Sequence, residues 1–525
     1  MKSRTNPACG TCRKKCRKCD RARPVCNRCR VKGLHCEGYP PRFLFFQDQL
    51  SSKSEQREDS MLSSGEPSPS GKTLRQETRS NHTTAINRQY RTGNNHKEHI
   101  CRPNQPQGKP DNALNASTAT NDAIGPTKPL LAATIDDILT LPETEKLLGY
   151  FDKTLCGALL IETDDFHNSF RGYILPLAYH DIGILHAVLG LTMCHITSSG
   201  KRETEKISVA SMIEHQLSAL QSLSSLLMKE EIYGLTDDEQ DILLAVVILL
   251  VLYDICETGV SSHGVHLTGA GYICGKLAQQ PKVITSPRTT FLLTALAWLD
   301  ILRGFSGAEK LAYRDNVRRC ILEAEHFNLE ILVGCPVELF YEIGCVLTAG
   351  KQYMDGRLSQ DDFQDLLNDA AQFFRVWNPD NAAFPGEDPE WIRLAEAYRH
   401  VCIIRVLRFP DAWAVPCEDH RIQSSVRAIL DASAGISADS TWFKRLLFPL
   451  FIAGAETSIP HQKRYVEFCM REIKESTGFP HPAMDELLTR VWGERQRQAG
   501  KPGNIPWMEF TCSRDLVRQH DYLMF

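Results

Sequence analysis

The sequence predicts three parts in succession: a small cysteine-rich module, a disordered linker and a large all-α domain. Seven of the 19 cysteines fall in a short N-terminal stretch, from Cys9 to Cys36. The chain then turns to Ser, Asn, Thr, Gln, Gly and Pro, with too few large apolar residues to offset the entropy of ordering. From about Leu130 apolar residues recur at helical spacing nearly to the end. The expected boundaries are 1–42 for the module, 43–128 for the linker and 129–525 for the helical domain.

The net charge of −4 hides an uneven distribution of charge along the chain. Residues 1–42 contain 13 of the 60 Lys and Arg but only two acids, Asp20 and Glu37, which gives a formal charge of +11. The remaining residues carry 47 basic and 62 acidic side chains, which gives −15. A basic head on an acidic body indicates that the head alone binds a polyanion.

The N-terminal cysteines follow a duplicated pattern. The unit Cys-x2-Cys-x6-Cys occurs twice, 17 residues apart, at Cys9, Cys12 and Cys19 and again at Cys26, Cys29 and Cys36. Thiolates separated by two residues can turn inward on one tight loop and bind one metal, and zinc accepts four such ligands tetrahedrally. Two separate sites would need eight ligands, so six thiolates suffice only if two sulfur atoms bridge. The spacing therefore predicts a fused cluster of two Zn²⁺ ions per chain.

These cysteines and their neighbours resemble the fungal zinc binuclear cluster family. The match extends to the basic run Arg13–Lys18, to Asp20 directly after the third cysteine, and to Pro24 two residues before the fourth. The resemblance implies a module with two short helices and a defined ligand set. In that set Cys9 and Cys26 are shared by both zinc ions, Cys12 and Cys19 complete one site, and Cys29 and Cys36 complete the other.

The resemblance also implies how the module meets double-stranded DNA. The short helix after Cys12 is expected to enter the major groove and to meet a GC-rich, CGG-like triplet. Its basic residues are Arg13, Lys14, Lys15, Arg17 and Lys18. A second group is expected to contact phosphates and set the register without reading bases: Arg21, Arg23, Arg28, Arg30 and Lys32. A basic run can also act as a nuclear-import signal, so we expect the protein in the nucleus.

One position departs from the family pattern. The residue three before the third cysteine is usually a lysine that reads guanines, and here it is Cys16. A thiol cannot supply the charged donor that suits guanine O6 and N7. The flanking Lys15 and Arg17 can take over base reading, and the preference for CGG stays open.

Cys16 also allows a rival metal register. One separate four-sulfur site would use Cys9, Cys12, Cys16 and Cys19, and a second site would use Cys26, Cys29, Cys36 and His35. This register does not explain why the unit Cys-x2-Cys-x6-Cys occurs twice. The extra thiol lends some support to a different function, a zinc- or redox-sensing protein without sequence-specific DNA binding. Such a protein should not need a head of charge +11 with ten Lys and Arg placed between its metal ligands.

Nothing in the sequence indicates a membrane or secretory segment. No apolar stretch reaches the roughly 20 residues of a membrane-spanning helix, and the longest, Ile242 to Tyr253, suits a buried helix. The N-terminus has no apolar leader. The cysteines outside the module are scattered singly, which is typical of buried thiols in a reducing compartment. The linker has no apolar heptads, so we expect no coiled coil beside the module, and the oligomeric state stays open.

The residues after the linker predict an all-α domain, because no stretch alternates with period two. Asp181–Ile196 and Asp241–Ile255 are expected to be mostly buried helices. Amphipathic helices are expected at Leu292–Leu302, Phe340–Thr348, Phe363–Val376, Ile392–Val406, Arg464–Glu475 and Met484–Trp492. One helix face is expected to carry Ile213, Leu217, Leu220 and Leu227, with Leu223 and Leu226 beside them. Pro379–Pro389 is expected to be a connecting loop.

Four segments of this domain resemble the second type of fungal-specific transcription factor domain. They are Tyr173–Ala178, Ile184–Leu189, Gly264–Ala270 and Phe448–Glu456. The resemblance covers most of residues 130–510. It implies a regulatory domain that senses an effector and contacts the transcription machinery, in a sequence-specific regulator of RNA polymerase II promoters. It also implies target genes in transport or secondary metabolism.

An enzyme is the remaining alternative. The stretch Asp237–Asp241 matches the DDxxD metal motif of all-α diphosphate-processing enzymes. However, Thr236 with Glu239 three residues later forms a capping box, and acids in a first helical turn complement the helix dipole. A second magnesium motif is missing, so we expect no catalytic activity. We expect core roles for His186, His195, His263 and His266, and for the aromatic residues of Trp442–Phe451.

Overall fold

The computed structural model describes residues 11–12, 26–32, 34–36, 134–163, 167–200, 208–261, 264–280, 286–324, 326–498, 504–511 and 521–522. The linker predicted at 43–128 lies outside these residues. The described residues from 134 onward are called the helical body below.

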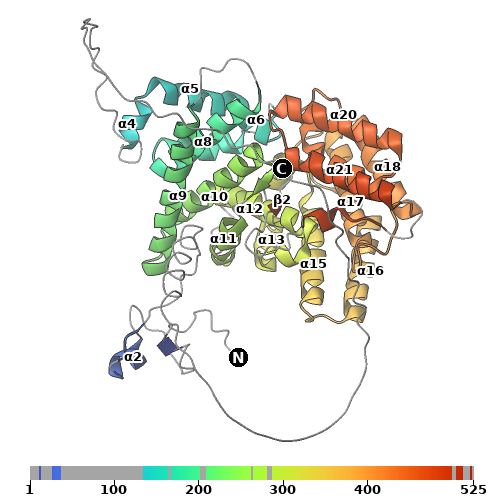
Figure 1. The fold of residues 1–525 in the computed structure, drawn as a ribbon, viewed down its shortest axis with the longest axis horizontal. Coiled ribbons are helices and arrows are strands. Elements are labelled where there is room, and N and C mark those ends of the chain that lie inside the picture. The colour runs from blue at the N-terminus through green and yellow to red at the C-terminus, as the bar shows by residue number, and fades with distance from the viewer. Residues whose placement is uncertain are drawn as a thin grey trace, which may run out of the picture. The chain divides into compact units, whose positions relative to one another are not determined.

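The helical body is all-α, as predicted (Figure 1). Its α-helices are α4 (Ile135–Leu139), α5 (Pro142–Tyr150), α6 (Cys156–Leu159), α7 (Leu175–Ala178), α8 (Ile182–Ser198), α9 (Val209–Ile232), α10 (Asp237–Glu257), α11 (Gly264–Leu277), α12 (Pro287–Ser306), α13 (Asp315–Leu322), α14 (Asn328–Val333), α15 (Val337–Met354), α16 (Gln360–Val376), α17 (Pro389–Leu407), α18 (His420–Ala434), α19 (Leu447–Glu456), α20 (Pro460–Thr477) and α21 (Pro482–Arg497).

Short elements connect these helices. The π-helical turns are η2 (Phe151–Leu155) and η3 (Phe170–Ile174), and the 3-10 turns are η5 (Ala308–Lys310), η6 (Pro379–Asn381), η7 (Phe443–Leu446) and η8 (Trp507–Phe510). Strand β1 (Val260–Ser261) pairs antiparallel with β2 (Asp521–Tyr522), which brings the C-terminal end back to the residues that follow α10. The loop expected at 379–389 therefore begins with a 3-10 turn.

Two central helices, α10 and α12, form the core of the body. Every residue of α10 from Leu243 to Cys256 is buried, and so is every residue of α12 from Thr289 to Ser306. A helix that is apolar on all sides must be covered by other elements. In Figure 1 the early helices α5, α8 and α9 lie on one side of this pair, and the late helices α17, α18, α20 and α21 lie on the other.

Local sequence signals set the helix ends. The capping box predicted at the start of α10 is present: the Thr236 hydroxyl accepts from the Glu239 amide, and the Glu239 carboxylate accepts from the Thr236 amide. Asp181 caps α8 in the same way, by accepting from the amide of Ile184. All eight helices predicted by residue range are present, and each of them extends to within a residue of the predicted ends or beyond them. The amphipathic character predicted for Leu292–Leu302 is wrong, because every residue of this segment is buried within α12.

The predicted apolar face of α9 is wrong in part. Ile213 is 46% exposed and Leu217 is 41% exposed, whereas Leu223 and Leu227 are buried as predicted. The buried face also includes Met212, His215, Ser218 and Ala219. These residues are buried because α8 packs closely against this face of α9: a Cβ built on Gly190 of α8 would lie 3.5 Å from the Cβ of His215 on α9. Small and polar residues of α9 therefore face the core. A prediction based on the spacing of large apolar residues does not detect them.

No single helix in the described part of the chain has the length and hydropathy of a membrane span. Phe170–Ala178 and Ile182–Ser198 meet those criteria only as a pair, and the pair is bent by 118°.

A buried ion pair joins α17 to α19. The guanidinium of Arg408, which follows α17, donates Nε–H to Oε1 of Glu456 at 3.1 Å and a second hydrogen bond to Oε2 of the same residue. The two side chains are 1% and 0% exposed. Arg408 also donates to the carbonyl of Val415. Arg495 lies 3.8 Å from the same carboxylate. Because the Arg408 and Glu456 charges do not reach water, their stability depends on these contacts within the protein.

Replacing Glu456 with Ala should destabilise the body by about 3–5 kcal/mol, because a guanidinium would stay buried without its carboxylate. Urea unfolding of the full chain, followed by circular dichroism, measures this change. The matched control is Glu486→Ala. Glu486 pairs with Arg490 on the surface, where both side chains are more than half exposed, so the expected loss is below about 1 kcal/mol. Equal stability of the two variants would contradict the prediction.

Candidate metal centre and nucleic-acid interface

The second cysteine repeat is arranged by a short helix, α2 (Asn27–Val31). Cys26 is its N-cap residue, and the Cys26 Sγ accepts a hydrogen bond from the Cys29 amide at 3.3 Å. This cap places both thiols of the Cys-x2-Cys unit on the same side of the first turn. Both side chains are 0% exposed. Leu34 and Cys36 pack against them and are half-buried.

A thiol from the first repeat joins this pair. The Cys12 Sγ lies 3.8 Å from the Cys26 Sγ and 3.9 Å from the Cys29 Sγ, and Cys12 is also 0% exposed. In tetrahedral zinc coordination with Zn–S bonds of about 2.3 Å, neighbouring sulfur atoms are about 3.8 Å apart. The three thiols are therefore as close together as zinc ligands are, and among the described residues they are the one group of three such side chains within ligand distance.

This arrangement bears on the two metal registers. A fused cluster requires Cys12 and the shared Cys26, which belong to different repeats, in one coordination sphere, and the 3.8 Å between their sulfur atoms fits this. The rival register separates Cys12 from that pair and adds the His35 imidazole to it. His35 is exposed, and it is its backbone carbonyl that faces inward, accepting from the Thr11 hydroxyl at 2.8 Å. The described geometry favours the fused cluster. Cys9, Cys16 and Cys19 lie outside the described residues.

The described basic side chains of the module differ in exposure and in the groups that they contact. Arg30 and Lys32 are exposed, and Arg30 donates to the Asn27 side chain at 2.7 Å. Arg28 is half-buried, and its Nη1 lies 3.6 Å from the Cys12 Sγ. The other predicted DNA contacts lie outside the described residues: Arg13, Lys14, Lys15, Arg17, Lys18, Arg21 and Arg23. The cysteine spacing gave no signal for the contact of Arg28 or for the hydrogen bond of Thr11.

In the acidic motif at the start of α10, three of the carboxylates form ion pairs with arginine and lysine side chains of the protein. Arg288 donates to Asp238 and to Asp241, at 2.6 Å in each case. Thr289 also donates to Asp241, whose pKa is nevertheless raised by burial. Lys229 pairs with Glu239 and holds the pKa of that carboxyl below its usual value. The acids at these three positions thus act in helix capping and packing, which does not favour the diphosphate-processing alternative.

The buried histidines are hydrogen-bonded core residues, as expected. His186 and His215 meet between α8 and α9, with Nδ1 to Nδ1 at 2.7 Å, and burial lowers the pKa of each to about 4. His195 contacts the Tyr150 hydroxyl at 3.1 Å and the Thr477 carbonyl at 2.9 Å. His266 is half-buried, and His263 lies outside the described residues. The aromatic residues Trp442, Phe443, Phe448 and Phe451 are buried, as predicted.

The described cysteines of the helical body are mostly buried thiols, as their scattered positions in the sequence predict. Its described cysteines form no disulfide, and all but the half-buried Cys345 are buried. Burial raises the pKa of the Cys156 thiol to about 12, so this group stays protonated and unreactive at neutral pH.

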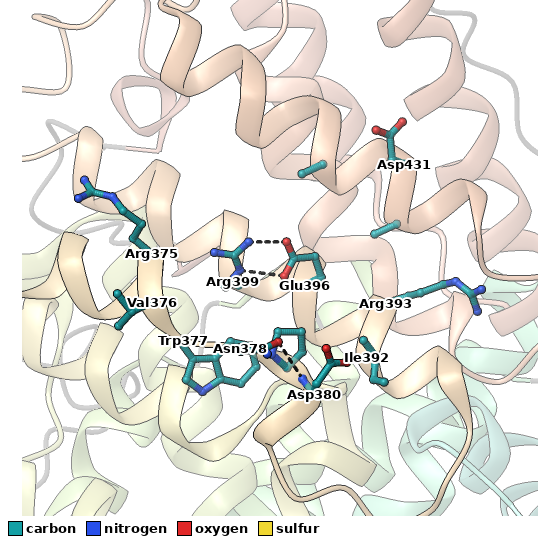
Figure 2. Close-up of a pocket in the computed structure, with 13 residues that line it drawn as sticks. Arg375, Val376, Trp377, Asn378, Asp380, Ile392, Arg393, Glu396, Arg399 and Asp431 are labelled. Carbon is teal, nitrogen blue, oxygen red and sulfur yellow. Dashed lines mark hydrogen bonds and ion pairs between the residues drawn. The ribbon is translucent and has the colours of Figure 1, made fainter.

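The body also contains an open groove that the sequence did not indicate. It lies where α16 ends, beside η6, α17 and α18, and measures about 670 Å³ (Figure 2). Trp377 and Ile392 line it, and the ion pair between Arg399 and Glu396 lies in it. Arg375, Arg393, Asp380 and Asp431 add two charges of each sign. The groove therefore carries no net charge.

Comparisons with known proteins identify both parts of the chain. The family model of the fungal Zn(2)-Cys(6) binuclear cluster domain matches residues 7–44. The family model of the fungal specific transcription factor domain matches residues 146–525, which is more than half of the chain. No curated protein and no solved structure was found that matches it. The chain therefore belongs to the fungal-specific transcription factor family, and it is a DNA-binding transcription regulator whose N-terminal cluster domain binds two zinc ions.

Proposed function

We propose that this regulator binds double-stranded DNA sequence-specifically at RNA polymerase II promoters in the nucleus. The convergence of Cys12 with Cys26 and Cys29 is the observation that supports it most directly. This contact closes the chain between the two repeats into a loop, and the loop contains the basic run. A metal bound at both ends of this stretch would restrict the conformations open to its cations and so favour their contact with a duplex.

The proposed ligands are the six cysteines of the duplicated pattern, with Cys9 and Cys26 shared between the two zinc ions. When bound, the ions supply the thiolate coordination that takes the place of an apolar core. Cys12, Cys26 and Cys29 lie together and are buried, as ligands of such a cluster would be. Cys36 packs against this group from the end of the second repeat.

The proposed DNA contacts fall into two groups. Lys15 and Arg17, beside Cys16, read bases in a GC-rich site. Arg13, Lys14 and Lys18 belong to the same groove segment. Arg30 and Lys32, which are exposed on and directly after α2, contact phosphates together with Arg21 and Arg23. Phosphate contacts give most of the affinity and its dependence on salt, whereas base contacts give the sequence preference.

The helical body is proposed to be regulatory and non-catalytic, and to contact the transcription machinery. Its acidic motif is paired within the protein at Asp238, Glu239 and Asp241, and this supports a structural role for those acids. Genes of transport or secondary metabolism are the proposed targets, on the family resemblance alone.

Base reading by the flanking residues is tested in the full-length, zinc-loaded protein. Selection from random duplexes should first recover a preferred site. Lys15→Ala or Arg17→Ala should then lower the preference for that site over base-substituted duplexes by about 1–3 kcal/mol, as expected for loss of a bidentate contact. Fluorescence anisotropy competition measures this preference.

The control for this test is Lys32→Ala. It should weaken binding to all duplexes about equally, because a phosphate contact carries no sequence information. If both Lys15→Ala and Arg17→Ala leave the relative affinities unchanged, the proposed groove contacts are wrong.

The metal register is tested by counting zinc. A fused cluster does not use Cys16, so the full chain with Cys16→Ser should retain two zinc ions per chain by elemental analysis. The control Cys12→Ser removes a ligand in either register and should lower the zinc content. Loss of zinc from Cys16→Ser as large as that from Cys12→Ser would support the rival register of separate sites.

A further inference from the structure

Arg28 lies between two metal ligands and points toward a third. It occupies the second position of α2, after the N-cap Cys26 and directly before Cys29. Its guanidinium is half-buried, and its Nη1 is 3.6 Å from the Sγ of Cys12. Arg30, two residues later on the same helix, is exposed and donates to the Asn27 side chain. The two arginines therefore differ in what their guanidinium groups meet.

The electrostatics of a fused cluster favour a cation at this place. Six thiolates carry −6 and two Zn²⁺ ions carry +4, which leaves −2 on the cluster. Buried thiolates retain excess negative charge on sulfur, and donors around metal ligands stabilise it and orient the ligand. An arginine N–H is a permanently charged donor, so its hydrogen bond to a thiolate is stronger than one from a neutral group.

The contact also joins the two repeats. Arg28 belongs to the second repeat and Cys12 to the first, so the guanidinium holds the helix of one repeat against a ligand of the other. A second link between the halves is the hydrogen bond from the Thr11 hydroxyl to the His35 carbonyl at 2.8 Å. Both links lie beside the three gathered thiols.

We propose that Arg28 is a positioning residue of the zinc cluster, which stabilises the Cys12 thiolate and keeps the two repeats together, rather than a contact to the DNA backbone. This inference rests on the proposed fused cluster, because it takes Cys12 to be a zinc-bound thiolate. It departs from the sequence-based expectation, which grouped Arg28 with the phosphate contacts.

The test compares Arg28→Ala, Arg28→Lys and Arg30→Ala in the full-length, zinc-loaded protein. The first readout is the rate of zinc transfer to a colorimetric chelator. Arg28→Ala should transfer zinc about tenfold faster or more, since a hydrogen bond to a charged group is lost. Arg28→Lys keeps the charge and should fall between that variant and the wild type. Arg30→Ala should retain zinc like the wild type, because its guanidinium does not reach a thiol.

The second readout is the salt dependence of DNA affinity. Each lost phosphate contact lowers the magnitude of the slope of log K against log salt by about 0.9. Arg30→Ala should show this decrease, and Arg28→Ala, once fully loaded with zinc, should keep the wild-type slope. An Arg28→Ala chain that cannot be loaded with two zinc ions, under conditions that load Arg30→Ala, would also support the proposal.

Zinc transfer from Arg28→Ala and Arg28→Lys at the wild-type rate would overturn the proposal, and a smaller salt slope would then assign Arg28 to a phosphate. This outcome is distinct from failure of the proposed function. If the wild-type chain with two zinc ions bound shows no preference among duplexes, sequence-specific binding fails while the zinc-transfer result for Arg28 still stands.

Discussion

The module depends on one constraint: thiols from both cysteine repeats must meet in one small volume. Cys12, Cys26 and Cys29 do so at sulfur separations of 3.8 and 3.9 Å, and among the described residues of the module the half-buried Leu34 packs against them. A segment this short cannot bury enough apolar surface to fold by packing, so metal–thiolate bonds must take the place of a core.

The helical body is stabilised in a different way, by the burial of apolar side chains. Its centre is a pair of helices, α10 and α12, that are buried on all sides. Some polar groups inside it are paired within the protein, as in the ion pair of Arg408 with Glu456 and the paired histidines between α8 and α9. Removing zinc should therefore leave the body folded. The two parts have separate sources of stability, and this allows DNA binding to be lost without loss of the regulatory domain.

The sequence predicted the larger features because they depend on local signals. Cysteine spacing indicated the metal module, and periodicity indicated the helices. The capping box at Thr236 showed that the acids after it begin a helix and are not a magnesium-binding motif. The failures arose where tertiary contacts decide. Ile213 and Leu217 are exposed because α9 turns its small and polar residues toward α8. The groove beside Trp377 depends on how α16, α17 and α18 meet, and the contact of Arg28 with Cys12 depends on how the two repeats fold together. Sequence spacing does not encode either arrangement.

The most direct test of this account is a zinc titration of the reduced, metal-free full chain, with binding to a selected and to a scrambled duplex measured at each step. If the cluster creates the DNA-binding surface, the metal-free chain should show only weak, salt-sensitive binding to both duplexes. Preference for the selected duplex should then rise as zinc is added and reach its full value at two ions per chain. A metal-free chain that already prefers the selected duplex by the same factor would contradict the account.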